Sequence, residues 1–141
     1  MTRTAADVLM KREVGMTPRA PYGMELVLDL HDCDPTMFTR ENLTQFFIDL
    51  CILLGMQRAD LHFWDYEGYP RQKEDAPPHL KGTTAVQFIS TSNITIHTLD
   101  DLRRVYLNIF TCKEFTPSHA IEFSVDFFDA GWCGHTVLVR L

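Results

Sequence analysis

The chain has 141 residues, a formal net charge of −6 at pH 7 and 45% hydrophobic residues, which fits one globular domain rather than a disordered segment. An acidic chain without clustered Lys and Arg lacks the surface that binds phosphates, so we expect no nucleic-acid partner. No apolar run reaches the roughly 18 residues of a membrane-spanning helix, and the first residues lack the apolar core of a secretory signal. We therefore expect a cytoplasmic protein that does not insert into a membrane.

The first part of the chain predicts a tail, a strand and a helix. Residues 1–21 are polar and end among prolines, so we predict an N-terminal tail there and one folded domain over residues 22–141. Met24–His31 alternates apolar with polar side chains, which is typical of a half-buried strand. Asp34 and the proline after it favour a helix start. Apolar residues at helical spacing extend this helix to Leu54, before a glycine that can end it.

The rest of the chain predicts further strands, a long loop and a second helix. Residues 65–81 hold three prolines and many charges, which is typical of a loop. Thr116 and the proline after it begin a helix that we expect to end at Gly131. Runs of β-branched and aromatic residues predict strands at Asp60–Trp64, Thr83–Ser90, Asn93–Thr98, Val105–Thr111 and Thr136–Leu141. This order predicts an α+β fold, a two-layer α/β sandwich with a mainly antiparallel sheet and helices on one face.

The cysteines give little support for a metal site. The four cysteines lie far apart and form no C-x-x-C pair, so we expect reduced thiols in a cytoplasmic protein. His31 with Cys33, and Cys133 with His135, are pairs of potential zinc ligands. Spacing alone does not bring the two pairs together, and we predict no metal site.

The chemically distinctive stretch is Ser92–Thr98, which is followed by Cys112. It brings a hydroxyl, an imidazole and a thiol into one region of the predicted sheet. On a strand, Asn93, Thr95 and His97 share a face because side chains alternate. By residue type alone, this pattern is typical of a polar strand face with a hydrogen-bonded histidine.

The order of these residues resembles the prokaryotic S-adenosylmethionine decarboxylases, a pyruvoyl-dependent family. That family carries a Ser-His-hydrophobic-Ser/Thr-Ile-His-Thr segment, followed by an aspartate-hydrophobic-Phe-Thr-Cys segment. The residues that match, at separations that need no gap, are Ser92, Ile94, Thr95, Ile96, His97, Thr98, Ile109, Phe110, Thr111 and Cys112. Upstream, the sequence from Gly82 to Thr84 resembles the family's Gly-Val-Ser-Gly turn.

The resemblance implies a self-processing enzyme. The chain would cleave itself between Thr91 and Ser92, and Ser92 would become a pyruvoyl group at the new N-terminus. The family assigns help in this cleavage to the positions of Thr84 and His97. The pyruvoyl group would form a Schiff base with the amine of the substrate and accept electrons as CO₂ is lost. Cys112 would return a proton to the substrate carbon, so the implied catalytic residues are Ser92, His97 and Cys112.

The chain departs from the family pattern at positions near the serine and in the predicted substrate site. Thr91 and Asn93 stand where the family has glutamate and histidine. Asp101 falls where the family has a glutamate that holds the ribose hydroxyls of the substrate. A carboxylate accepts hydrogen bonds from a diol, so we expect Asp101 and Asn93 to contact the substrate.

Three functions remain open at this point. The first is decarboxylation of S-adenosylmethionine, which supplies aminopropyl groups for spermidine synthesis. The second keeps the pyruvoyl chemistry but acts on arginine, ornithine or another amino acid, and the changed substrate-recognising positions favour it. The third is an uncleaved, non-catalytic homologue that binds a ligand or a partner. Because relatives in the family build their active sites between subunits, either enzyme would be at least a homodimer.

Overall fold

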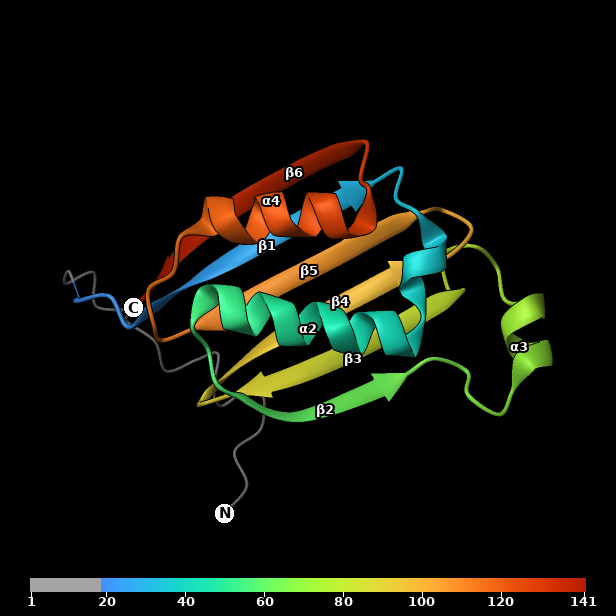
Figure 1. The fold of residues 1–141 in the computed structure, drawn as a ribbon, viewed down its shortest axis with the longest axis horizontal. Coiled ribbons are helices and arrows are strands. Elements are labelled where there is room, and N and C mark those ends of the chain that lie inside the picture. The colour runs from blue at the N-terminus through green and yellow to red at the C-terminus, as the bar shows by residue number, and fades with distance from the viewer. Residues whose placement is uncertain (1–18) are drawn as a thin grey trace, which may run out of the picture.

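Six antiparallel strands form one sheet in the computed structural model, which describes residues 19–141 (Figure 1). Their order across the sheet is β2-β3-β4-β5-β1-β6. The strands are β1 (Gly23–His31), β2 (Arg58–Trp64), β3 (Gly82–Ile89), β4 (Ser92–Leu99), β5 (Arg104–Thr111) and β6 (Trp132–Arg140). Residues 1–18 of the predicted N-terminal tail lie outside the described part of the chain.

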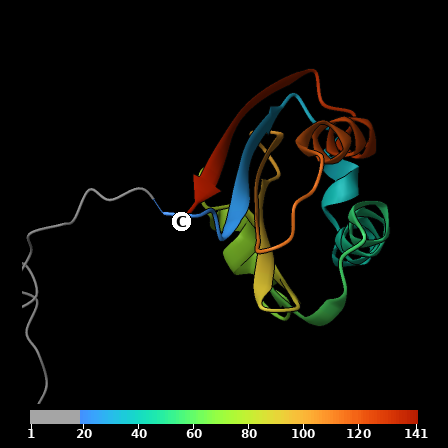
Figure 2. The same ribbon diagram turned by 90° about the vertical axis from the view of Figure 1, so that its left-hand side faces the viewer.

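Two helices, α2 (Arg40–Leu54) and α4 (Pro117–Phe128), lie side by side on one face of the sheet (Figures 1 and 2). A short helix, α3 (Pro70–Asp75), lies beyond the end of the sheet (Figure 1). The two-layer α+β sandwich predicted from the sequence is therefore confirmed. Within residues 19–141, none of the helices has the length and apolar character needed to cross a membrane.

The predicted start of the first helix was wrong by several residues. Asp34 caps a short 3-10 helix, η1 (Pro35–Phe38), by accepting a hydrogen bond from the backbone of Thr36 at 3.0 Å. The α-helix begins only at Arg40, where the Thr39 hydroxyl accepts from the N–H of Asn42 at 3.1 Å. Asp34 and Thr39 are both good N-caps, and the sequence alone did not show that each caps a separate helix.

Two further boundaries and one predicted loop also differ from the structure. Helix α4 ends at Phe128, before Gly131, because Asp129 adopts a left-handed conformation with φ of 49°, which Asp tolerates better than most residues. Strand β6 begins at Trp132, opposite His31, because pairing with β1 extends it. The predicted loop over residues 65–81 contains α3, which has no buried residue and therefore leaves no apolar periodicity in the sequence.

The core lies between the helices and the sheet. Its largest fully buried side chains are aromatic and aliphatic residues of α2, α4 and the central strands: Phe46, Phe47, Phe128, Leu26, Leu28, Leu30, Leu43, Leu50, Ile94, Ile96, Leu107 and Ile109. No helix of residues 19–141 covers the other side of the sheet, called the open face below (Figure 2). Its central strands carry polar side chains, which include Thr84, Thr95, His97, Tyr106 and Asn108.

Candidate active site

Ser92 and Cys112 are neighbours at one end of the central strands. Ser92 is the first residue of β4; its side chain is on the helix-facing side, and the residue is only 7% exposed. Cys112 directly follows the end of β5, and its backbone N–H donates to Ser92 Oγ at 3.3 Å. Antiparallel pairing of β4 with β5 brings them together across 20 residues of sequence. The hydroxyl and the thiol singled out from the sequence thus share one site.

Thr91, the residue before Ser92, has a strained backbone. It lies in the two-residue turn between β3 and β4, with φ of 58°. Tight hairpin turns need positive φ and normally place Gly or Asn there, whereas a β-branched residue in this region is an outlier. Such a conformation costs about 1–3 kcal/mol and persists only where surrounding structure enforces it. Here the pairing of β3 with β4 enforces it, directly beside the Thr91–Ser92 peptide bond.

The Cys112 thiol is exposed and lies 3.6 Å from Thr91 Oγ1. A hydrogen bond from the Thr91 hydroxyl lowers the pKa of Cys112, and further bonds from Ser92 and Tyr22 act in the same direction. The Thr91 hydroxyl also lies 2.8 Å from the carbonyl oxygen of Ser90. Because it has one proton, it can donate either to that oxygen or to an ionised sulfur. Cys112 is therefore more readily ionised than an ordinary exposed thiol.

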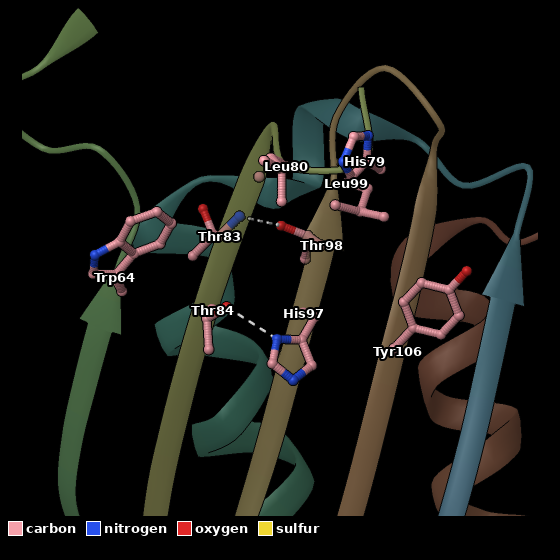
Figure 3. A pocket seen from close by; sticks show the side chains of 10 residues that line it. Trp64, His79, Leu80, Thr83, Thr84, His97, Thr98, Leu99 and Tyr106 are labelled. Carbon is pink, nitrogen blue, oxygen red and sulfur yellow. Dashed lines mark hydrogen bonds between the residues drawn. The ribbon is translucent and has the colours of Figure 1, made fainter. Parts of the chain in front are cut away.

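His97 and Thr84 form a second cluster, at the opposite end of the same strands. Thr84 on β3 and His97 on β4 are opposite each other, and Thr84 Oγ1 lies 2.9 Å from His97 Nδ1 (Figure 3). They line a cavity of about 300 Å³ on the open face, with Trp64 on one side and Tyr106 on the other. The hydroxyl fixes the orientation of the imidazole ring and leaves Nε2 free of this bond.

A single chain does not bring the His97 cluster to Ser92. The two residues are five positions apart on one strand, which corresponds to roughly 17 Å. Their side chains also point to opposite faces, because Ser92 shares the helix-facing side with Ile94 and Ile96. The expectation that Asn93 and His97 share a face with Thr95 is confirmed. The structure thus divides the residues singled out from the sequence into two separate clusters.

The two residues expected to contact substrate lie at different ends of β4. Asn93 follows Ser92, and its side-chain oxygen accepts a hydrogen bond from Thr95 Oγ1 at 3.3 Å. Asp101 lies in the turn between β4 and β5, at the His97 end, where its carboxylate pairs with Lys81 Nζ at 3.0 Å. Within one chain, Asp101 therefore belongs with the His97 cluster and Asn93 with the Ser92 cluster.

Tyr22 is a residue of the Ser92 cluster that the sequence did not reveal. It precedes β1 and lines a cavity of about 390 Å³ together with Cys112 and Phe115. A second cavity of about 290 Å³ lies on the Thr91 side of Cys112 and includes Lys113. Nothing in the local sequence links Tyr22 to Cys112, because their proximity arises from the pairing of β1 with β5.

The two pairs of potential zinc ligands do not form a metal site. Cys33 is fully buried, whereas Cys133 is exposed on β6. The ring of His31 lies against Trp132, with ring centroids 4.7 Å apart. Across residues 19–141, no three His, Cys, Asp or Glu side chains gather closely enough to hold a metal ion.

Comparisons with known proteins agree with one another. The model of the S-adenosylmethionine decarboxylase family matches residues 24–141. The S-adenosylmethionine decarboxylase proenzyme of Hydrogenobaculum sp. (strain Y04AAS1) is 25% identical over 99 residues, which cover 70% of this chain and 63% of that relative. The matched stretch thus spans less than two thirds of the relative. The crystal structure of adenosylmethionine decarboxylase from Aquifex aeolicus VF5 has the same fold, with a TM-score of 0.69 at 15% identity, covering 86% of this chain and 92% of that one.

Cys112 should be the thiol whose alkylation depends on Thr91. We expect iodoacetamide at pH 7 to modify Cys112 much faster than Cys33 and Cys51, because burial raises the pKa of each of those two thiols to about 11. Thr91→Val keeps the branched shape but removes the hydroxyl, so Cys112 should react several-fold more slowly. Peptide mass spectrometry of chains that also carry Ser92→Ala measures the rates before any cleavage.

The exposed Cys133 provides the internal control, since it lies on β6, away from Thr91. Its alkylation rate should be the same in both chains. An unchanged rate at Cys112 in the Thr91→Val chain would show that the Thr91 hydroxyl does not stabilise the thiolate.

Proposed function

Because the chain belongs to the S-adenosylmethionine decarboxylase family, we propose that it is a pyruvoyl-dependent decarboxylase that cleaves itself between Thr91 and Ser92. The single observation that carries this proposal is the strained φ of 58° at Thr91, next to the bond that would break. Ser92 Oγ is held beside this bond by the N–H of Cys112. Strain in the reactant and a positioned nucleophile both lower the barrier to an intramolecular attack.

The proposed cleavage needs only side chains of this protein and water. Ser92 Oγ attacks the carbonyl carbon of Thr91, and the amide bond is exchanged for an ester as the Ser92 nitrogen takes up a proton. Loss of the Ser92 α-proton then expels the Thr91 carboxylate, which ends the N-terminal fragment. Water replaces the nitrogen of the remaining dehydroalanine and releases ammonia. The product is a pyruvoyl group at residue 92, and breaking the bond also relieves the turn.

The residues around Ser92 fit a pyruvoyl group at this position. Such a group supplies an electrophilic carbonyl that binds an amine and accepts electrons during loss of CO₂. Cys112 lies against residue 92 and faces the cavity that Tyr22 lines. Its thiol is exposed to a ligand and readily ionised, as a group that delivers and regains a proton during turnover must be.

We infer that a second copy of the chain completes the site. His97 and Thr84 lie on the polar open face, roughly 17 Å from Ser92 along the strand. Stacking two open faces about a two-fold axis perpendicular to the strands would place the His97 end of one copy over the Ser92 end of the other. The partner's His97 would then lie beside the Thr91–Ser92 peptide on the open side of the sheet, the side away from Ser92 Oγ, where Nε2 could exchange a proton with that peptide. The partner's Asp101 would arrive at the same end, which suits recognition of a ribose diol.

This arrangement favours S-adenosylmethionine over a simple amino acid as the substrate. The cavity beside His97 is lined by the rings of Trp64, His79 and Tyr106, and aromatic rings stack on flat heterocycles. An amino-acid substrate would be too small to contact these rings and Asp101. The decarboxylated product would provide aminopropyl groups for spermidine synthesis.

Substrate and chemistry can be tested together. We expect the purified protein to release CO₂ from S-adenosylmethionine, with little release from arginine or ornithine. Ser92→Ala should abolish both cleavage on a denaturing gel and CO₂ release. Cys112→Ala should leave cleavage largely intact and slow turnover by about 10²–10⁴-fold, which is the usual contribution of a positioned acid. Activity only on the amino acids would favour the alternative substrate class.

The two-chain site can be tested by complementation. We expect chains with His97→Ala alone to remain uncleaved, because no copy in the dimer carries the imidazole. Co-expression with chains that carry Ser92→Ala should restore cleavage, and only the His97→Ala chains should be cut, because they keep Ser92 and receive His97 from the partner. Differently sized tags on the two chains identify the cleaved one by mass. Failure of co-expression to restore any cleavage would contradict a site shared between chains.

A further inference from the structure

Strand β6 leaves its outer edge open. It is the last strand of the sheet, and it pairs with β1 from His31↔Trp132 to Gly23↔Arg140 without a register shift (Figure 1). No other strand of residues 19–141 pairs with its outer side. The exposed fractions of Val137, Leu138 and Val139 are 40%, 44% and 63%. A long apolar edge of this kind recruits another strand unless it is protected.

The usual means of protection are absent from β6 but present on the other edge of the sheet. Strand β6 contains no Lys, no Pro and no acidic residue. Its one charged residue, Arg140, already pairs with Glu25 of β1. Strand β2, by contrast, carries Arg58 and Asp60 and has a register shift between Arg58 and Leu61. Charges and bulges at an edge prevent strand addition, so of the two edge strands only β6 is suited to pair with a strand of another chain.

We propose that β6 pairs antiparallel with β6 of a second copy, so that one sheet runs through two chains. A two-fold axis perpendicular to the sheet must place one residue of β6 opposite the same residue of the second copy. If all nine residues overlap, this residue is Thr136, the middle of the strand. The pairing closes after two copies, whereas pairing of β6 with β2 would continue without limit. This surface is separate from the open face, and the proposal does not depend on the self-cleavage chemistry.

The strand is complementary to itself in this register. The pairs across the axis would be Cys133 with Val139 and His135 with Val137 on the helix-facing side, and Trp132 with Arg140 and Gly134 with Leu138 on the open side. No like charges meet, and a guanidinium lies beside an indole, which is a favourable pair. In a chain with a net charge of −6, an edge without carboxylates is also where two copies repel each other least.

On the open side, the ring of Trp132 fills the space above Gly134. A Cβ at this position would lie 2.7 Å from the ring of Trp132, which folds over the glycine. The partner's Leu138 would sit across from Gly134 and cover the indole, which is 52% exposed in one chain. On the other side, α4 lies over β1 (Figure 2), and Val137 and Val139 stay 40% and 63% exposed. The same residues of a second copy would cover both.

Disulfide trapping tests the register. Directly opposed residues of antiparallel strands have Cα atoms about 4.5–5.5 Å apart, within the range that a disulfide spans. In a chain with Cys112→Ala, which removes the other exposed thiol, we expect Val139→Cys to form a covalent dimer with Cys133 under mild oxidation. The matched control is Leu138→Cys, which lies on the other face and should stay monomeric on a non-reducing gel.

Molar mass in solution tests the association itself. Light scattering should show that Val137→Lys halves the molar mass, whether or not the open faces also associate. The control Ile52→Lys alters an apolar side chain of α2 that is 74% exposed, and it should leave the mass unchanged. Equal masses for wild type and Val137→Lys, or absence of the Val139→Cys crosslink, would overturn the proposal. Either result would mean that another segment of the same chain, or nothing, covers the edge.

Discussion

The antiparallel pairing of β3, β4 and β5 is the constraint on which the candidate site depends. The tight turn from β3 into β4 holds Thr91 at a positive φ that its branched side chain disfavours. The ladder between β4 and β5 places Cys112 beside Ser92. Both contacts follow from strand register, and helices α2 and α4 stabilise this register by burying the apolar side of the same strands. A serine hydroxyl, a strained turn and an ionisable thiol therefore meet at one end of the sheet.

The same register moves His97 away from Ser92. Alternation along β4 sends Ser92 toward the helices and His97 toward the open face, so one chain holds two incomplete clusters. In the function proposed here, each cluster completes the other across two copies. The polar character of the open face fits this role, because side chains such as Thr84 and His97 would face a partner and a substrate rather than a dry core.

Much of the fold could be predicted from the sequence because the strands alternate so regularly. Leu26, Leu28 and Leu30 mark the buried side of β1, and the class of fold followed from the order of such segments. The ends of the elements were harder to predict from the sequence. Trp132, for example, belongs to β6 only because β1 provides a pairing partner opposite it. Helix α3 was missed because it has no buried residue.

The sequence pointed to Ser92, His97 and Cys112 through a family resemblance, and their roles stay a prediction. How the three residues are arranged could not be predicted, because the side of the sheet on which each lies depends on strand register and on where β4 begins. The strain at Thr91 could not be read from residue type, because threonine is unusual at such a turn. Tyr22 approaches Cys112 only through the pairing of β1 with β5, and no local pattern indicates this contact.

The mass of the C-terminal fragment tests the central claim most directly. The purified wild-type protein, denatured and treated with a reagent that labels carbonyl groups, would be measured by intact mass spectrometry. The proposed chemistry requires a fragment of residues 92–141 that has lost the serine nitrogen and carries one label, next to an unlabelled fragment that ends at residue 91. A single unlabelled chain of full length in every preparation would contradict self-cleavage at this bond.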